Sequence, residues 1–306
     1  MSGASGVRQG LQCRSAFVAN EYGVLREVAV CNPTYFEWAA ENAIVAQAKL
    51  NGLYVDPSAA AAQHRELVDA LQQAGAVCRF IEADPYLPMQ TFARDSAVMT
   101  PWGLLINQMA RPERRGEWVA VDRMASEYGF PIWKRITAAA LEGGDIQVLR
   151  DGEALIGVNE VRTFAAAAEQ LETWFKESGW NVRKVSVPAH FLHLDVLFSV
   201  LNDKVALCAT DILEPADVDW LAERFELIPV SYRDVMKMGC NVTALGNDRV
   251  LSTRQHVEMN TRLRALGFKI YDPDIEQFVL EGGSTHCLTM PLRRDCPTQQ
   301  ASAKKT

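Results

Sequence analysis

One unit recurs about five times along this chain of 306 residues, and it limits the possible folds more than any other feature. Each unit opens with two short apolar runs joined by a turn, a pattern that predicts a β-hairpin. A helical stretch follows, and then one more short strand-like run. We expect the hairpins at 96–108, 146–159, 196–209 and 242–253.

The helical stretches carry clear end signals. Stretches 58–74, 117–128, 164–178 and 255–266 each run up to a glycine, and Pro215 opens another at 215–225. The strand-like runs after them are Val77–Ile81, Pro131–Ile136, Val182–Val187, Leu227–Val230 and Lys269–Tyr271. A fixed period of this length favours a ring of supersecondary units over a doubly wound sheet.

The two ends of the chain supply the remaining unit. We expect Leu288–Leu292 to pair with Val28–Cys31 and close the ring. The predicted fold is therefore an α/β, five-fold pseudo-symmetric propeller, built as one domain over residues 1–296. Residues 297–306 are polar, and we expect them to form a disordered tail.

The residues just ahead of the hairpins and of the last strand are chemically informative. In a pseudo-symmetric ring, equivalent positions face one axis, so residues remote in sequence share one pocket. We call them the axial positions: Asp95, Asp145, Asp195, Asn241 and Cys287, spaced by 50, 50, 46 and 46 residues. Glu142 and His193 lie a few residues upstream of two axial positions and are expected at the same mouth.

Cys287 stands in Glu281-Gly-Gly-Ser-Thr-His-Cys287, a glycine loop before an apolar run. A lone cysteine is more often a small buried hydrophobe than a nucleophile. Its place among axial carboxylates favours function. Carboxylates raise the pKa of a nearby thiol, and a bound cation would reverse that effect. A planar guanidinium suits paired carboxylates because its forked donors match them bidentately.

The composition of the chain limits the kinds of partner that we expect it to bind. The formal net charge of −7 argues against nucleic acid and suits a small cationic substrate. No segment reaches transmembrane length, and the N-terminus lacks the layout of a signal peptide. We therefore expect a cytoplasmic protein with no membrane partner, whose seven cysteines stay reduced. The absence of a CxxC pair argues against structural zinc.

Four motifs, in order along the chain, resemble those of the guanidino-modifying (pentein) superfamily. They are Phe92-Ala-Arg-Asp95, Glu142-Gly-Gly-Asp145, His193-Leu-Asp195 and Gly282-Gly-Ser-Thr-His-Cys287. The superfamily includes arginine deiminases, dimethylarginine dimethylaminohydrolases and glycine amidinotransferases. The resemblance spans nearly the whole chain, and it implies the same five-fold α/β propeller that the repeat predicts.

The resemblance also implies roles. Cys287 would be the nucleophile and His193 the general acid/base, while Glu142 orients the guanidinium. Asp95 and Asp195 would bind the guanidinium nitrogens.

Three further residues are expected to serve the substrate. Asp145 would contact it or support the loop. Arg162 and Arg114 lie in segments that resemble the arginine-bearing, substrate-gripping segments of deiminases. For Arg114, the alternative is a solvated basic face over 111–117.

The implied mechanism is covalent and needs no metal or organic cofactor. The favoured activity is hydrolysis of arginine or an N-substituted arginine to a citrulline-type ureido product and an amine or ammonia. Glu142-Gly-Gly-Asp145 is deiminase-like, although no insertion separates Asp95 from Glu142 as in long arginine deiminases. The second candidate is an amidinotransferase, because His286-Cys287 and Leu292-Arg293-Arg294 resemble the end of such enzymes.

Two other classes stay open. His190, His193 and Asp195 have the spacing of metal ligands, which would indicate a metallohydrolase. A non-catalytic binding propeller is the other. The sequence leaves undecided which guanidine is bound, the roles of His190 and His286, and the oligomeric state, although a propeller rim is compatible with a homo-oligomer.

Overall fold

The computed structural model describes residues 17–39 and 43–295. Its strands form five three-stranded sheets, each an antiparallel pair extended by a parallel third strand. The sheets are β15 (Met290–Arg294), β1 (Leu25–Cys31) and β2 (Val77–Ile81); β3 (Ala97–Thr100), β4 (Gly103–Ile106) and β5 (Ile132–Arg135); β6 (Ile146–Arg150), β7 (Glu153–Val158) and β8 (Asn181–Ser186); β9 (Phe198–Val200), β10 (Val205–Cys208) and β11 (Glu226–Pro229); and β12 (Thr243–Ala244), β13 (Arg249–Leu251) and β14 (Lys269–Tyr271).

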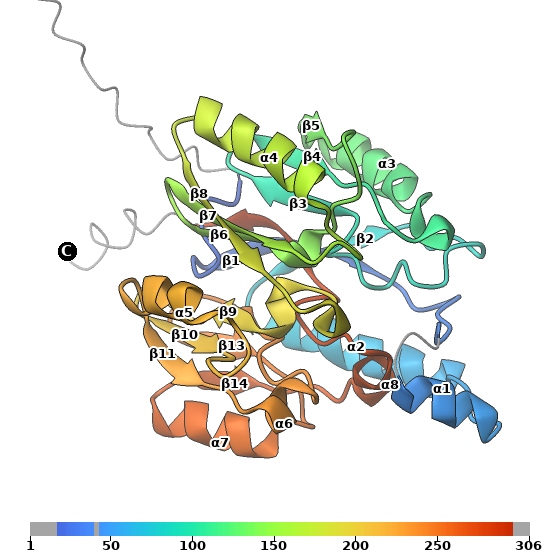
Figure 1. The fold of residues 1–306 in the computed structure, drawn as a ribbon. Helices are drawn as coiled ribbons and strands as arrows, with labels where there is room; N and C mark the ends of the chain where they lie inside the picture. The colour runs from blue at the N-terminus through green and yellow to red at the C-terminus, as the bar shows by residue number, and fades with distance from the viewer. Residues whose placement is uncertain (1–16, 40–42, 296–306) are drawn as a thin grey trace, which may run out of the picture.

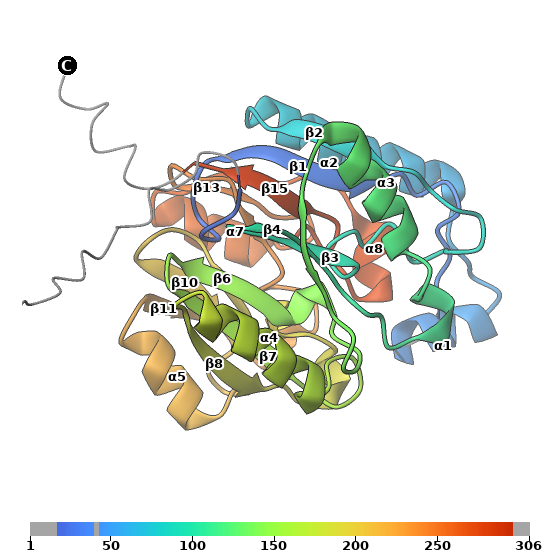
Figure 2. The same cartoon turned by 90° about the horizontal axis from the view of Figure 1, so that it is seen from above.

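A helix links the two parallel strands of every sheet, because parallel neighbours need a long crossover. These helices are α2 (Pro57–Gln73), α3 (Trp118–Tyr128), α4 (Ala165–Glu177), α5 (Pro215–Ala222) and α7 (Val257–Ala265). Figures 1 and 2 show them on the outside of the ring. We call each sheet with its helix a blade. The predicted hairpin–helix–strand unit and the five-fold α/β propeller are confirmed.

The remaining helices are short. They are α1 (Ala43–Leu50), α6 (Tyr232–Val235), α8 (Glu276–Glu281) and the 3-10 turns η1 (Pro112–Arg114), η2 (Gly143–Asp145), η3 (Ala189–Phe191) and η4 (Leu194–Val196). Turns η2 and η4 each contain an axial aspartate, so the axial side chains lie ahead of the strands.

Glycine ends the long helices as the sequence predicts. Gly129 caps α3 at φ +72°, and its backbone N–H donates to the carbonyl of Ala125. Only a residue without a Cβ adopts this left-handed conformation freely. At the N-terminus of α2, the Asp56 carboxylate accepts hydrogen bonds from the backbone N–H groups of Ser58 and Ala59 at 2.8 and 3.0 Å.

The first and last strands close the ring. Strand β15 pairs antiparallel with β1, with Ala29 opposite Met290 and Val28 opposite Pro291, and Figure 2 shows the two side by side. The strand begins at Met290 and not at Leu288, because the backbone N–H of Leu288 donates to Ser284 in a helical turn at 3.0 Å. The predicted closure is confirmed, two residues later than expected.

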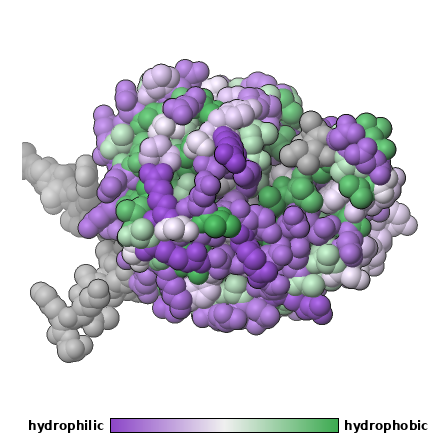
Figure 3. All heavy atoms as spheres, turned by 90° about the horizontal axis from the view of Figure 1, so that it is seen from below, coloured by the Kyte–Doolittle hydropathy of each residue, from purple (hydrophilic) through white to green (hydrophobic). Residues whose placement is uncertain are grey.

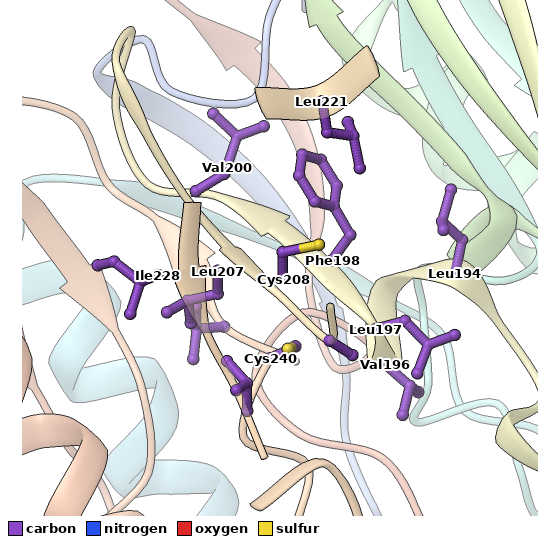
Figure 4. Packing of buried hydrophobic residues seen from close by; sticks show 14 of the residues in the cluster. Leu194, Val196, Leu197, Phe198, Val200, Leu207, Cys208, Leu221, Ile228 and Cys240 are labelled. Atoms are coloured by element: carbon purple, nitrogen blue, oxygen red, sulfur yellow. The ribbon is translucent and has the colours of Figure 1, made fainter. Parts of the chain in front are cut away.

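The core lies within and between blades. Phe198, Leu207, Cys208 and Leu221 are almost wholly buried in one cluster, where β9 and β10 meet α5 (Figure 4). Burying each large apolar side chain contributes about 1.5–3 kcal/mol. The face in Figure 3 is mostly hydrophilic, with apolar residues in separate patches.

None of the helices in the described part of the chain is long and apolar enough to span a membrane. The cysteines within it are all free thiols: Cys31, Cys78, Cys208, Cys240 and Cys287. Cys13, Cys296 and the predicted tail at 297–306 lie outside the described residues.

Candidate active site

Hydrogen bonds between consecutive blades gather the axial positions around one axis, as the repeat predicts. Each bond joins one axial residue to the next axial residue or to a residue within three positions of it, and together they run around the ring. The bonds are Arg94 N to Cys287 O (3.1 Å), Gly143 N to Asp95 O (3.0 Å), Leu194 N to Asp145 Oδ1 (2.8 Å), Asn241 Nδ2 to Asp195 O (3.3 Å) and Ser284 N to Asn241 Oδ1 (3.1 Å).

The Cys287 thiol is buried between an amide and a carboxylate. The Asn241 Nδ2 donates to its Sγ at 3.1 Å, and the Sγ lies 3.6 Å from Oδ2 of Asp195. Burial raises the pKa of Cys287 well above its usual value, and the negative charges of Asp195 and Asp95 raise it further. Both effects favour the neutral thiol over the thiolate at neutral pH.

His193 and Glu142 form a buried pair. The Nε2 of His193 lies 2.8 Å from Oε2 of Glu142, and its Nδ1 lies 3.7 Å from Oδ1 of Asp95. Burial disfavours the charged ring, but Asp95 and Glu142 outweigh that effect and raise the pKa of His193 to about 10. Burial alone would raise the pKa of Glu142, but the hydrogen bond to His193 and the positive charges of His193 and Arg114 together lower it. The pair is thus an imidazolium and a carboxylate.

The backbone around His193 is strained. Leu192 adopts φ +67° and ψ −58°, and the N–H of His193 donates to the carbonyl of Phe191 at 2.8 Å. This is a γ-turn of the rare hand, which costs free energy at any residue with a Cβ. The Nδ2 of Asn159 holds it by donating to the Leu192 carbonyl at 2.6 Å. Such strain persists only where surrounding contacts fix the position of a side chain, here that of His193.

Asp145 supports the same loop from the other side. Its Oδ1 accepts from the backbone N–H of Leu194, and its Oδ2 accepts from Asn159 at 3.2 Å. The carboxyl is fully buried, and burial raises its pKa to about 7. Of the two roles expected for Asp145, the contacts favour support of the loop.

Arg114 lies inside the protein, and the alternative of a solvated basic face is therefore wrong. Its guanidinium is 3% exposed and contacts Asp95 Oδ2 at 2.9 Å through Nη1. Its Nε and Nη2 bind Glu117 bidentately at 2.7 and 3.0 Å. Asp95 Oδ1 makes no hydrogen bond to the described residues, although it borders a cavity. Arg114 therefore orients Asp95 so that one carboxylate oxygen remains for a ligand.

Arg162 comes from the loop after β7 and borders the same cavity. Its Nη1 lies 3.4 Å from Oε2 of Glu142, and its side chain is buried. Burial lowers its pKa to about 10, so the guanidinium stays charged at neutral pH. This placement suits the expected contact with an anionic group of the substrate.

Asp195 and His286 form a second buried pair. The Oδ2 of Asp195 lies 2.7 Å from Nδ1 of His286, while its Oδ1 has no hydrogen-bond partner in the described chain. His286 Nε2 lies 3.9 Å from a carboxylate oxygen of Glu21, which binds Arg94 at 3.0 Å. Burial alone would raise the pKa of Asp195, but the contact with His286 and the positive charges of His193 and Arg94 together lower it. His286 thus keeps a carboxylate charged beside the thiol.

The cavity that these groups border is narrow, about 30 Å³. The lining residues are Met89, Phe92, Asp95, Arg114, Arg162, Leu192, His193, Glu281, Gly282, Gly283 and Cys287.

The proposed set of metal ligands is not assembled. His190 is exposed and stacks on Phe191 with 3.9 Å between ring centroids, while Asp195 binds His286. Within the described residues, the group of acids and histidines close enough to share an ion is Asp95, Glu142 and His193. Those two carboxylates already contact Arg114 and Arg162, which compensate their charge.

Sequence reasoning missed four contributors. Asn241 was recognised as an axial position, but its bond to the thiol was not foreseen. Glu21 lies outside every quoted motif, so no signal pointed to it, and Glu117 ends the segment 111–117, in which only Arg114 was singled out. Glu281 opens the glycine loop of Cys287, and its place in the cavity wall was not predicted.

A model of the protein family described as N,N dimethylarginine dimethylhydrolase, eukaryotic, matches residues 32–294. The chain belongs to this family. Membership places it in the pentein superfamily, as the four motifs predicted.

Two relatives illustrate the sequence similarity of this chain to known proteins. The uncharacterized protein YkgA of Bacillus subtilis is 29% identical over 275 residues, which cover 90% of this chain and 94% of that protein. An arginine deiminase of Listeria monocytogenes is 28% identical over 259 residues, covering 69% of this chain. The match spans only 62% of the length of that enzyme.

Solved structures share the fold. The N-terminal domain of ArgZ, an arginine dihydrolase from cyanobacteria, superposes with a TM-score of 0.76 at 17% identity, covering 88% of this chain and 98% of that domain. DDAH from Pseudomonas aeruginosa, complexed with citrulline, gives a TM-score of 0.75 at 19% identity, with coverages of 87% and 99%. At these identities the likeness concerns the propeller fold alone.

Proposed function

We propose that this protein hydrolyses the guanidinium group of arginine or an N-substituted arginine. One observation carries the proposal: a buried thiol and an Asp95 oxygen that makes no hydrogen bond to the described residues border one cavity. Burying these two polar groups costs free energy unless a ligand supplies the interactions that they lose with water. A guanidinium would do so, because it offers an electrophilic carbon together with several N–H donors.

Binding of the cation starts the reaction. A guanidinium beside Asp95 and Asp195 neutralises the charges that raise the pKa of Cys287. The thiol then gives its proton to bulk water, and the thiolate attacks the guanidinium carbon. The new S–C bond gives a tetrahedral adduct, whose nitrogens are held by Asp95 and Glu142.

His193 supplies the proton for the next step. Its imidazolium protonates the departing nitrogen, the C–N bond breaks, and an amine or ammonia leaves. An amidino-cysteine remains on the enzyme. The neutral imidazole then takes a proton from water as the water attacks the same carbon. The C–S bond breaks, the hydroxyl proton passes to the departing Cys287 sulfur, and a ureido product is released. An acceptor amine in place of that water would give amidino transfer instead.

Mass spectrometry of the products tests this proposal. The protein is incubated with arginine, methylated arginines and agmatine, each with and without glycine as acceptor. Citrulline-type products without acceptor, lost in Cys287→Ser and kept in Cys78→Ser, are the expected result. Cys78 is a matched control because it is a half-buried thiol on β2, outside the cavity lining. Products that appear only with glycine would replace hydrolysis by amidino transfer.

A further inference from the structure

Asn159 joins the two irregular loops that carry Arg162 and His193. It is the first residue after β7, and only 9% of it is exposed. Hydrogen bonds from its side chain run to both loops, although it does not line the cavity itself. The reaction above gives it no part, so we asked what this connection does.

The amide oxygen of Asn159 fixes the loop of Arg162. Its Oδ1 accepts from the backbone N–H groups of Val161, Arg162 and Thr163 at 3.0, 2.7 and 3.1 Å. Glu160, in the same loop, adopts φ +56°, which is unfavourable for a residue with a Cβ. Such a conformation persists only where surrounding contacts hold it, and the amide oxygen supplies those contacts.

The amide nitrogen of Asn159 fixes the turn of His193. Its Nδ2 donates to the carbonyl of Leu192 at 2.6 Å and to Oδ2 of Asp145 at 3.2 Å, which uses both N–H donors of the amide. The other oxygen of Asp145 accepts from the backbone N–H of Leu194 at 2.8 Å. Asn159 therefore holds the residue before His193 directly and the residue after it through Asp145.

The two loops are consequently coupled. Because Oδ1 and Nδ2 of Asn159 belong to one planar amide group, they move together, and a displacement of the Arg162 loop reaches the His193 turn. The loops meet again at Glu142, whose Oε2 lies 3.4 Å from Nη1 of Arg162 and 2.8 Å from Nε2 of His193. A ligand that binds Arg162 thus acts on the position of the His193 ring.

We infer that Asn159 is a positioning residue, through which an anionic substrate group bound at Arg162 improves the placement of His193. The inference rests on the proposed function, in which His193 protonates the departing nitrogen. It adds how the far end of the ligand affects the chemical step. Binding energy from a remote part of a substrate can be used at the reacting centre, and a truncated substrate then loses kcat as well as affinity. A purely structural role of Asn159 is the competing explanation.

Nuclear magnetic resonance of enzyme labelled with ¹⁵N-histidine tests the coupling without turnover. The chain has five histidines, and His193→Gln identifies the signals of His193. The ligand is L-norvaline, which has the α-carboxylate of arginine but a propyl side chain without a guanidinium. In the Cys287→Ser background, L-norvaline should shift the His193 signals. Adding Asn159→Ser should abolish that shift, because serine keeps an acceptor for neighbouring N–H groups but is too short to reach Leu192.

Asn202→Ser is the matched control and should keep the shift. The Oδ1 of Asn202 likewise accepts from the backbone N–H groups of Lys204 and Val205, at 2.9 and 2.8 Å. Its Nδ2 donates to a carboxylate oxygen of Asp248 at 2.7 Å, in a hairpin turn that does not line the cavity.

Kinetics give the second readout. In the enzyme with an intact Cys287, Asn159→Ser should lower kcat for L-arginine about 10- to 100-fold, since a misplaced catalytic group costs about 100-fold in rate. The kcat for agmatine, which lacks the carboxylate, should fall less than about threefold. Thermal unfolding of the same samples measures any loss of stability. If Asn159→Ser does not fold, Asn159→Asp replaces it, because aspartate keeps the acceptor oxygen and removes the N–H donors.

An absent response of His193 to L-norvaline in the Cys287→Ser parent would overturn the inference. So would an equal response with Asn159→Ser, or equal losses of kcat on arginine and agmatine, which would make Asn159 purely structural. A coupled response in an enzyme that forms no product would refute hydrolysis alone. Product formation with a silent His193 would refute the coupling alone.

Discussion

Gly144 to alanine tests how closely the position of the His193 ring limits catalysis. A Cβ on residue 144 would lie 2.8 Å from Cγ and Nδ1 of His193 and 2.9 Å from its Cβ. Carbon atoms in favourable contact are about 3.5–4.0 Å apart, so the ring must move by roughly 0.7–1 Å. That shift would break or lengthen the 2.8 Å hydrogen bond to Glu142.

A misplacement of this size costs about 100-fold in rate, or about 2.7 kcal/mol of activation free energy. Overpacking should lower the free energy of unfolding by about 1–3 kcal/mol. The pKa of His193 should also fall from about 10 as the Glu142 contact weakens. The alkaline limb of the pH–rate profile should therefore move to lower pH.

The assay is kcat against pH on the best guanidino substrate, with thermal unfolding of the same samples. Gly116→Ala is the control, because its Cβ would meet Leu87 at an ordinary 3.4 Å. A Gly144→Ala enzyme with kcat within threefold of the wild type and an unchanged pH profile would refute the reasoning. So would a rate loss that only follows the loss of folded protein.

Three further predictions concern single side chains. Cys287→Ser should abolish turnover without a change in circular dichroism, and full activity would overturn the covalent mechanism. Asp95→Asn should lower kcat/KM for guanidinium substrates about 100-fold, since it removes one charge-assisted contact and leaves Arg114 less compensated; unchanged kinetics would remove Asp95 from the site. Burial lowers the pKa of His64 to about 4, below the value near 6.5 in the unfolded chain. The unfolded state then binds more protons between these values, so stability should fall as pH drops from about 7 to about 4. In urea titrations, His64→Leu should reduce this loss in the free energy of unfolding by up to about 3 kcal/mol. An unaltered dependence on pH would exclude His64 as its source.

The periodic features of the fold were predictable because they are local. Glycines at 75, 129, 179 and 267 follow helices of the expected length, and all four have positive φ. The even spacing of Asp95, Asp145 and Asp195 predicted a shared axis, since the repeat itself creates the symmetry. Strand β15 begins two residues later than predicted, because the helical turn that contains Cys287 extends into the apolar residues that predicted a strand.

The paired charges at the site were not predictable in the same way. The contacts of Arg114 with Asp95 and Glu117 depend on how a loop folds back into the protein, and the segment 111–117 reads equally well as an exposed basic face. The turn at Leu192 has no glycine or asparagine to announce its positive φ. The contact between His286 and Asp195 joins residues 91 positions apart in different blades, a relation that no local pattern encodes.

The pairing of β1 with β15 also has a consequence for biosynthesis. Strand β1 is complete at Cys31, while its partner begins only at Met290. At 5–20 residues per second, the ribosome needs roughly 15–50 s to make the chain between them. Throughout that interval the nascent protein exposes an open strand edge, the kind of surface on which chains aggregate. Cys287 is translated three residues before the strand that closes the ring, so the thiol and the closing strand are synthesised almost together.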